Sequence, residues 1–144
     1  MVRLKISAKT EYACIAIVEL AAYYETGEPV RVGKIAEENG IPLRFLVQIL
    51  LQLKGAGLVA SVRGASGGYR MIVPPADVSL GRVMEVIEGQ RSLTTGANRA
   101  SPSAVALLDV WQKIAEAERA MLAATSVADL VDRMKRHREP MYYI

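Results

Sequence analysis

In the first part of the chain, apolar residues recur every three or four positions, which is the spacing of one face of an α-helix. Ser7 is a typical N-cap residue, and the apolar pattern after it predicts a core helix that reaches about Thr26 and is ended by Gly27. Residues 30–40 predict a second, short helix with Gly40 at its C-terminal end. The pattern therefore indicates a mainly helical fold.

A third helix is predicted after Pro42, which suits a first-turn position because that position needs no N–H group. With the short helix and the glycine turn before it, this makes a helix-turn-helix. Its apolar arc should face the core and consists of Leu46, Ile49, Leu50 and Leu53. The opposite side carries Arg44, Gln48, Leu51 and Gln52. Arg and Gln can read guanine and adenine edges in a major groove, although a solvated helix face has a similar composition.

Residues 58–62 and 69–73 have the pattern of two short strands joined by the loop RGASGG, which predicts a β-hairpin, the wing of a winged helix. Arg63 at the base of the loop can reach a phosphate or the minor groove. Three loop glycines let the backbone turn and approach a ligand closely: Gly64, Gly67 and Gly68. A nucleotide-phosphate loop is less suitable, because this loop lies between strands and lacks a Gly-Lys-Ser/Thr ending.

In the second half, residues 77–89 predict a fourth helix capped by Ser79 and ended by Gly89. Residues 90–102 lack periodicity, which is typical of a flexible loop. A long helix follows from about Ser103. Its apolar stripe includes Leu107, Val110, Trp111, Ile114, Ala117 and Met121. The stripe is wider than the core of so small a domain needs, so we expect two copies to pair along it. Burial within one chain is the alternative.

A last short helix over 125–136 should be capped by Thr125 or Ser126, and the apolar tail 141–144 should dock on a surface. The predicted fold class is mainly α with a small β-hairpin. Residues 1–89 form a winged helix-turn-helix DNA-binding domain, residues 90–102 a flexible loop, and residues 103–144 a dimerisation helix with a C-terminal docking segment.

The charge distribution favours an anionic partner for the N-terminal half. Residues 1–70 hold nine Lys and Arg against six Glu, whereas residues 71–144 hold nine of each sign, so the net charge of +3 lies in the first half. The chain has 144 residues, which suits one domain. No apolar run approaches the roughly 18 residues of a membrane span, and Glu11 and Glu19 interrupt the N-terminal run, so we expect a cytoplasmic protein with no membrane contact.

Several segments resemble the Rrf-two family of bacterial winged-helix regulators. They are ISAKTEYA, the helix-turn-helix ending LKGAGLV, the wing SVRGASGGYR, the helix SLGRVMEVIEG, and WQKIAEAERAMLAATSVADL. They occur in the family order over nearly the whole chain. The resemblance implies a homodimer held by the long helix, with each wing and third helix binding half of a near-palindromic site in double-stranded DNA.

The resemblance also implies roles for individual residues. Base contacts would come from Arg44 and Gln48, with Arg63 at the minor groove. Phosphate contacts would come from Lys5, Ser7, Lys9, Tyr12, Ser66, Gly67 and Gly68. Val47 departs from cluster-bearing relatives, which often have an acidic residue there, so the operator preference of this chain should differ from theirs.

Several members of that family hold an iron–sulfur cluster, mainly through three cysteines in the loop before the long helix. Here residues 90–102 contain neither Cys nor His, and Leu108 stands where a histidine ligand would be placed. Cluster iron needs thiolate or similar donors. We therefore predict no cluster, no metal and no other cofactor, as in the clusterless branch of the family.

The single cysteine, Cys14, lies among alanines and isoleucines, so a buried, inert thiol is favoured over a redox switch. No set of residues with supporting context indicates catalysis, so no enzyme is predicted. The leading hypothesis is a dimeric, sequence-specific transcriptional regulator, a repressor. The alternatives are an interaction module that recruits a metabolic enzyme, and a sensor that uses Cys14 or a small-molecule pocket under the long helix.

Overall fold

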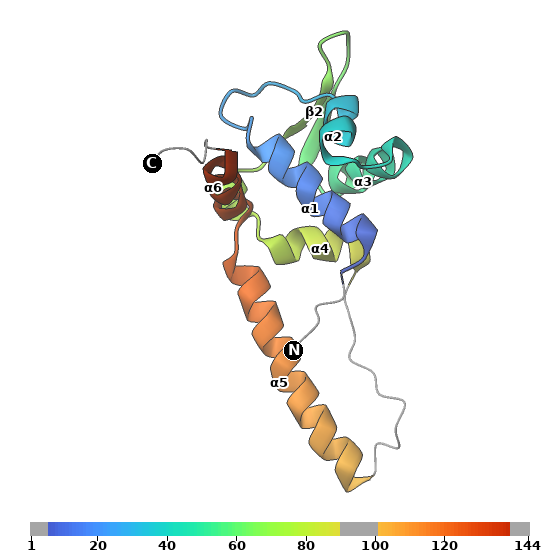
Figure 1. Ribbon diagram of the computed structural model, residues 1–144, viewed down its shortest axis with the longest axis vertical. Helices are drawn as coiled ribbons and strands as arrows, with labels where there is room; N and C mark the ends of the chain where they lie inside the picture. The colour runs from blue at the N-terminus through green and yellow to red at the C-terminus, as the bar shows by residue number, and fades with distance from the viewer. Residues whose placement is uncertain (1–5, 90–100, 139–144) are drawn as a thin grey trace.

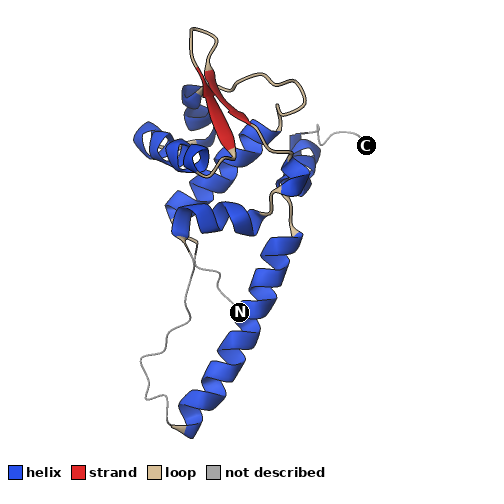
Figure 2. Ribbon diagram, turned by 180° about the vertical axis from the view of Figure 1, so that it is seen from behind, coloured by secondary structure: helices blue, strands red, loops and turns tan. Residues whose placement is uncertain are grey.

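The computed structural model describes residues 6–89 and 101–138. Its elements are α1 (Ala8–Ala21), α2 (Val32–Asn39), α3 (Leu43–Gly55), β1 (Val59–Val62), β2 (Gly68–Met71), the 3-10 turn η1 (Pro75–Asp77), α4 (Leu80–Glu88), α5 (Pro102–Ala124) and α6 (Val127–Arg138). The predicted class, mainly α with a small β-hairpin, is confirmed (Figure 1, Figure 2). Lys5, most of the predicted loop at 90–102 and the tail 141–144 lie outside the described residues.

Helix α1 begins as predicted and ends earlier than predicted. The Ser7 hydroxyl accepts a hydrogen bond from the Thr10 N–H at 3.2 Å, which is N-capping geometry. The helix stops at Ala21 rather than near Thr26, because the N–H groups of Tyr23 and Tyr24 bond to carbonyls three residues back and the chain tightens into a turn. Gly27 closes this turn with a φ of 70°.

The helix-turn-helix is confirmed by α2, the turn at Gly40, and α3. Gly40 takes the left-handed conformation, with φ 63° and ψ 33°, and the Ala36 carbonyl accepts from the N–H groups of both Gly40 and Ile41. Pro42 is the N-cap of α3 rather than its first helical residue, which is a shift of one position from the prediction. The turn ends α2 sharply and starts α3 in a new direction.

The hairpin follows α3 directly, as predicted, and pairs Val59 with Met71 and Val62 with Gly68 in an antiparallel register. A contact not foreseen from the sequence fixes it to the body. Val30, just before α2, forms a β-bridge with Tyr69 through N–H to carbonyl bonds of 2.7 and 2.9 Å. Because Val30 is also buried, the hairpin is held at its inner edge by the segment that leads into the helix-turn-helix.

The core forms around α1, which packs against α2, α3, α4, α6 and β2. The predicted inward residues of α3 are all buried, as are Ile17 and Leu20 of α1 and Val83 of α4. Ser79 caps α4 by accepting from the Arg82 N–H at 3.0 Å, and Gly89 follows its last residue, both as predicted. Burial of these side chains from three helices fixes the orientation of α3 relative to the hairpin.

Helix α5 projects away from this body, whereas α6 returns to it (Figure 1). The chain is fastened at the joint, where the Leu80 N–H donates to the Thr125 carbonyl and the Val127 N–H donates to the Val78 carbonyl, both at 2.8 Å. Val127 and Val131 of α6 are buried against the core, but Ala104 is the one buried residue of α5. The alternative of a long helix buried within its own chain is therefore wrong.

Candidate nucleic-acid interface

The outward side of α3 carries polar and apolar side chains together. Arg44, Gln48 and Leu51 are exposed, as predicted, and the Arg44 guanidinium lies over the ring of Phe45, 4.9 Å from its centroid. Gln52 is different: it is half-buried, and its Oε1 is buried without a hydrogen-bond partner in the described part of the chain. The expectation that Gln52 belongs to the outward row is therefore wrong.

The wing has a fixed shape because two of its glycines leave no room for a side chain. A Cβ on Gly67 would lie 2.1 Å from the Val62 carbonyl oxygen, and a Cβ on Gly68 would lie 2.2 Å from the carbonyl oxygen of Val30. Arg63 and Ser66 are exposed on the loop, whereas Gly67 is buried. Of the predicted wing contacts, Arg63 and Ser66 thus present side chains outward, and the glycines shape the loop that carries them.

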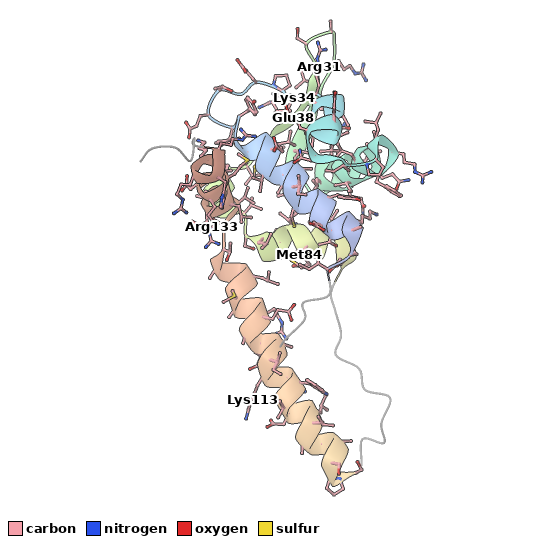
Figure 3. All side chains as sticks on the ribbon, in the orientation of Figure 1. Arg31, Lys34, Glu38, Met84, Lys113 and Arg133 are labelled. Carbon is pink, nitrogen blue, oxygen red and sulfur yellow. The ribbon has the colours of Figure 1, made fainter. Side chains whose placement is uncertain are left out.

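Arg31 is a residue of this surface that the sequence interpretation did not select. Its guanidinium donates a hydrogen bond to the Ala65 carbonyl near the tip of the wing, and Figure 3 shows it beside the hairpin. The two residues are 34 positions apart, so no local pattern links them. The sequence shows only that Arg31 directly follows Val30. That Val30 bridges to the wing is visible in the structure alone. Arg31 therefore positions the loop that holds Arg63.

The start of α1 holds the remaining predicted phosphate contacts. The Ser7 hydroxyl is used within the protein, since it donates to the Thr10 hydroxyl at 2.9 Å, and Thr10 in turn donates to a Glu88 carboxylate oxygen at 2.8 Å. Lys9 and Tyr12 are half-buried. In Figure 1 this end of α1 lies at the same edge of the body as α3, with α6 on the opposite side.

The electrostatic character of the surface follows from a run without carboxylates. From residue 40 to residue 76 the chain has four cations and no Asp or Glu. The four are exposed: Arg44, Lys54, Arg63 and Arg70. Within residues 6–89 and 101–138 none of them forms an ion pair, and Lys54 instead donates to the Ser61 hydroxyl at 2.9 Å. Helix α3 and the wing together therefore present uncompensated positive charge.

A second surface lies on α5. Four large apolar residues of the predicted stripe are exposed: Leu107 (52%), Val110 (49%), Trp111 (45%) and Met121 (74%). Ala117 is also exposed, and Ile114 is half-buried. So many large apolar side chains along one helix indicate a surface that another molecule covers.

Cys14 lies in a protected environment. It is half-buried on α1, in the wall of a largely apolar cavity of about 630 Å³ bounded by α1, α4, α5 and α6. Burial, together with the nearby carboxylates of Glu88 and Glu11, raises the pKa of the thiol to about 11. Reactive cysteines need the opposite conditions, so the geometry agrees with an inert thiol and argues against a redox switch.

Other kinds of site find little support in the described residues. No three His, Cys, Asp or Glu side chains there gather closely enough to hold a metal ion. A search of the same residues finds no helix with the length and apolar character that a bilayer crossing requires.

An exposed second helix in a helix-turn-helix, with a two-stranded wing beside it, defines the class of winged-helix transcriptional regulators. Residues 6–133 match the family model of Rrf2, described as an iron-dependent transcriptional regulator. The chain belongs to the Rrf2 family. The predicted resemblance is thus confirmed, and relatives in this family are named as transcriptional regulators rather than as enzymes.

Two relatives cover most of the chain. Rv1287 of Mycobacterium tuberculosis, named as an HTH-type transcriptional regulator, is 37% identical over 131 residues, which are 88% of this chain and 81% of that one. CymR of Bacillus subtilis is 32% identical over 142 residues, 98% of this chain and 100% of that one.

Solved structures agree. The structure of B. subtilis CymR, described as the global cysteine regulator of that organism, has a TM-score of 0.81 at 33% identity and covers 91% of this chain and 98% of its own. The structure of IscR from T. potens has a TM-score of 0.79 at 31% identity and covers 97% of this chain and 95% of its own.

Proposed function

We propose that the protein is a homodimeric, sequence-specific DNA-binding regulator that represses transcription and holds no iron–sulfur cluster. The observation that carries this proposal is the exposed cationic surface of α3 and the wing, which no carboxylate between residues 40 and 76 compensates. A duplex is a dense polyanion, and an exposed helix beside a wing has the dimensions to enter its major groove.

In this proposal the residues divide by what they contact. Arg44 and Gln48 read base edges, because they stand on the outward side of α3. Arg63 enters the minor groove from the wing, where its charge finds a strong negative potential. Backbone phosphates are bound by Lys5, Ser7, Lys9, Tyr12, Ser66, Gly67 and Gly68. The half-buried Lys9 and the internally bonded Ser7 must contribute through partial exposure and backbone N–H groups.

Dimerisation is supported by the exposed stripe on α5. Pairing of two copies would cover Leu107, Val110, Trp111 and Met121, which are otherwise left in water. It would also join two DNA-binding surfaces by a rigid helix, so that each reads one half of a two-fold symmetric operator. A dimer seated over a promoter blocks polymerase, which makes repression the expected output.

The residues present do not fit an iron–sulfur cluster. Cluster ligands are thiolates, and the chain has one cysteine. That cysteine lies on α1, and its raised pKa keeps it protonated at neutral pH. The loop at 90–102, where the family resemblance would place the ligands, contains neither Cys nor His. We therefore assign no step of the mechanism to a cluster.

Titration of fluorescent duplexes at a series of salt concentrations tests the proposal. Wild-type protein should retard promoter fragments at low salt, with an affinity that falls steeply as salt rises. Arg63→Ala should weaken binding to specific and random duplexes alike and reduce the salt slope by about one per protomer. Gln48→Ala should mainly reduce the preference for the operator over random sequence.

Arg133→Ala is the matched control, because Arg133 is an exposed arginine on α6 at the opposite side of the body (Figure 3). It should leave both affinity and salt slope unchanged. Equal losses for Arg63→Ala and Arg133→Ala would mean that the cationic surface of α3 and the wing has no special role. Failure of wild-type protein to retard any genomic fragment at low salt would overturn DNA binding altogether.

A further inference from the structure

Helix α3 carries an apolar row that the assignment of Arg44 and Gln48 leaves unexplained. Leu43, Val47 and Leu51 follow one another at intervals of four residues, so they form one row along the helix. Their exposed fractions are 53%, 40% and 54%. The core face of α3 is already complete without them, since Leu46, Ile49, Leu50 and Leu53 are buried. We call Leu43, Val47 and Leu51 the apolar row.

The surroundings of the apolar row indicate what covers it. Its residues alternate along α3 with Arg44 and Gln48, and Lys54 follows in the next turn, so an apolar partner with negative charge nearby fits this face best. An apolar protein surface would have to bring carboxylates to these cations. A DNA major groove brings phosphates at its rims, and the C5-methyl groups of its thymines stand in the groove between them.

We propose that the apolar row reads C5-methyl groups of pyrimidines in the major groove, with Val47 and Leu51 each covering a thymine methyl of the operator. The inference rests on the proposed DNA-binding function and adds the chemistry of its specificity. Valine and leucine have no hydrogen-bonding group, so at these positions they distinguish thymine from cytosine by the methyl group alone. The operator should therefore contain an A·T pair opposite each of the two residues.

The test uses the full-length protein and a duplex selected by it from a random pool. Each thymine of that operator is replaced in turn by uracil, which removes the methyl group and keeps the base pair. At two or more positions in each half-site the replacement should weaken binding about threefold to fourfold, the effect of leaving one methyl-sized apolar group uncovered. At other positions it should have no effect.

Protein variants then assign the methyl groups. In Val47→Ala the cost of uracil should disappear at one position, and in Leu51→Ala at another, because the covering side chain is gone. Ile72→Ala is the matched control, since Ile72 is a similarly exposed apolar residue (42%) outside α3. It should keep the full uracil effect at every position. Thermal unfolding of each variant verifies the fold, which truncation at exposed positions should leave intact.

Other outcomes would overturn the inference. If wild-type protein prefers its selected operator but neither uracil for thymine nor 5-methylcytosine for cytosine changes binding anywhere, the apolar row does not read methyl groups, while the proposed DNA-binding function stands. Duplexes with 5-methylcytosine in place of cytosine test the other possible source of a C5-methyl group. Tighter binding to them, without any uracil effect, would mean that the row reads methylated cytosine instead of thymine.

Loss of self-association in Val47→Ala or Leu51→Ala would assign the row to a second copy of the chain. Failure to select any preferred sequence would overturn the function and the inference together.

Discussion

Helices α1 and α5 both carry rows of apolar residues, but the chain buries the row on α1 and leaves the row on α5 exposed. In α1, 7 of 14 residues are buried, whereas in α5 the described structure buries 1 of 23. The apolar face of α1 is covered by α3, α4 and α6 of its own chain. The face of α5 extends beyond the body and has no such cover (Figure 1). Helical spacing thus predicts that a face will be covered, but the covering molecule depends on where the fold places the helix.

The largest effect should come from placing a charge on the exposed face of α5. Trp111→Glu puts a carboxylate where we expect the partner helix, so it should separate the dimer and lower operator affinity about a hundredfold, because the two half-sites no longer bind together. Sedimentation and DNA titration measure the two effects. Gln112→Glu, at an exposed neighbouring position, is the control. Trp111→Glu protein that stays dimeric would contradict pairing along α5.

Truncation inside α1 should act differently. Ile17 is completely buried, so Ile17→Ala should lower the free energy of unfolding by about 3 kcal/mol at every protein concentration. Leu107→Ala on α5 should instead cause a loss that grows as the protein is diluted, because it weakens association. Urea unfolding at two protein concentrations distinguishes the cases. If both variants depend on concentration in the same way, the contrast between the helices fails.

Cys14 tests the protected character of α1 by pH. Its thiol pKa is raised from 9.0 to about 11, so the folded protein holds the proton more tightly than the unfolded chain. The resulting stability is complete below about pH 9 and is lost as pH rises through 11. Cys14→Ala should remove this dependence. As pH rises from 9 through 11, the free energy of unfolding of the wild type should therefore fall relative to that of the variant, by less than about 3 kcal/mol. A difference that does not change with pH would place the thiol in a solvated setting.

The smallest effect concerns the joint between α5 and α6. The Ser126 hydroxyl accepts from the Asp129 N–H at 3.0 Å, and the Asp129 carboxylate accepts from the Ser126 N–H at 2.9 Å, which lowers the pKa of Asp129. Ser126→Ala should cost about 1 kcal/mol, because the hydroxyl cap is lost, and should raise the pKa of Asp129 only in part, because the Ser126 N–H still donates to the carboxylate. Unfolding and NMR titration measure the two effects. Thr125→Ala is the control, because the Thr125 hydroxyl donates to the Met121 carbonyl and does not cap α6. Equal effects of the two variants would mean that the Ser126 hydroxyl is not the cap of α6.

Much of the fold was predictable because its signals are local. Gly40, Ser79 and Gly89 mark helix ends by their own backbone and hydrogen-bonding preferences, and the spacing of α3 identifies its buried side. The early end of α1 was missed, because an apolar pattern continues through Tyr23 and Tyr24 although the backbone has already turned. The domain boundaries at 89 and 103 remain a prediction.

The residues of the candidate site were predictable only where the side chain's own chemistry, such as the charge of Arg or the amide of Gln, indicates contact with DNA. Arg44, Arg63 and Gln48 stand out as exposed polar residues on a helix and a loop. Arg31 did not, since its role depends on a contact with Ala65 across 34 positions of sequence. Gln52 was misplaced for a related reason: its angle on the helix is outward, but neighbouring elements bury its oxygen. Long-range packing, which one sequence pattern does not encode, decides such cases.

In the proposed dimer, the two backbone hydrogen bonds at the α5 joint would couple the angle of α5 to the position of the DNA-binding surface. They fasten Thr125 to Leu80, the first residue of α4, and Val127 to Val78 just before it, so α5 would turn together with the body. Helix α5 is about 35 Å long at 1.5 Å per residue, and a tilt of about 10° displaces the far end of such an arm by about 6 Å. Since base pairs stack about 3.4 Å apart, this displacement shifts the two half-sites by nearly two base pairs. If two copies pair along α5 as proposed, a signal that changes their crossing angle would release the protein from its operator without contacting the DNA.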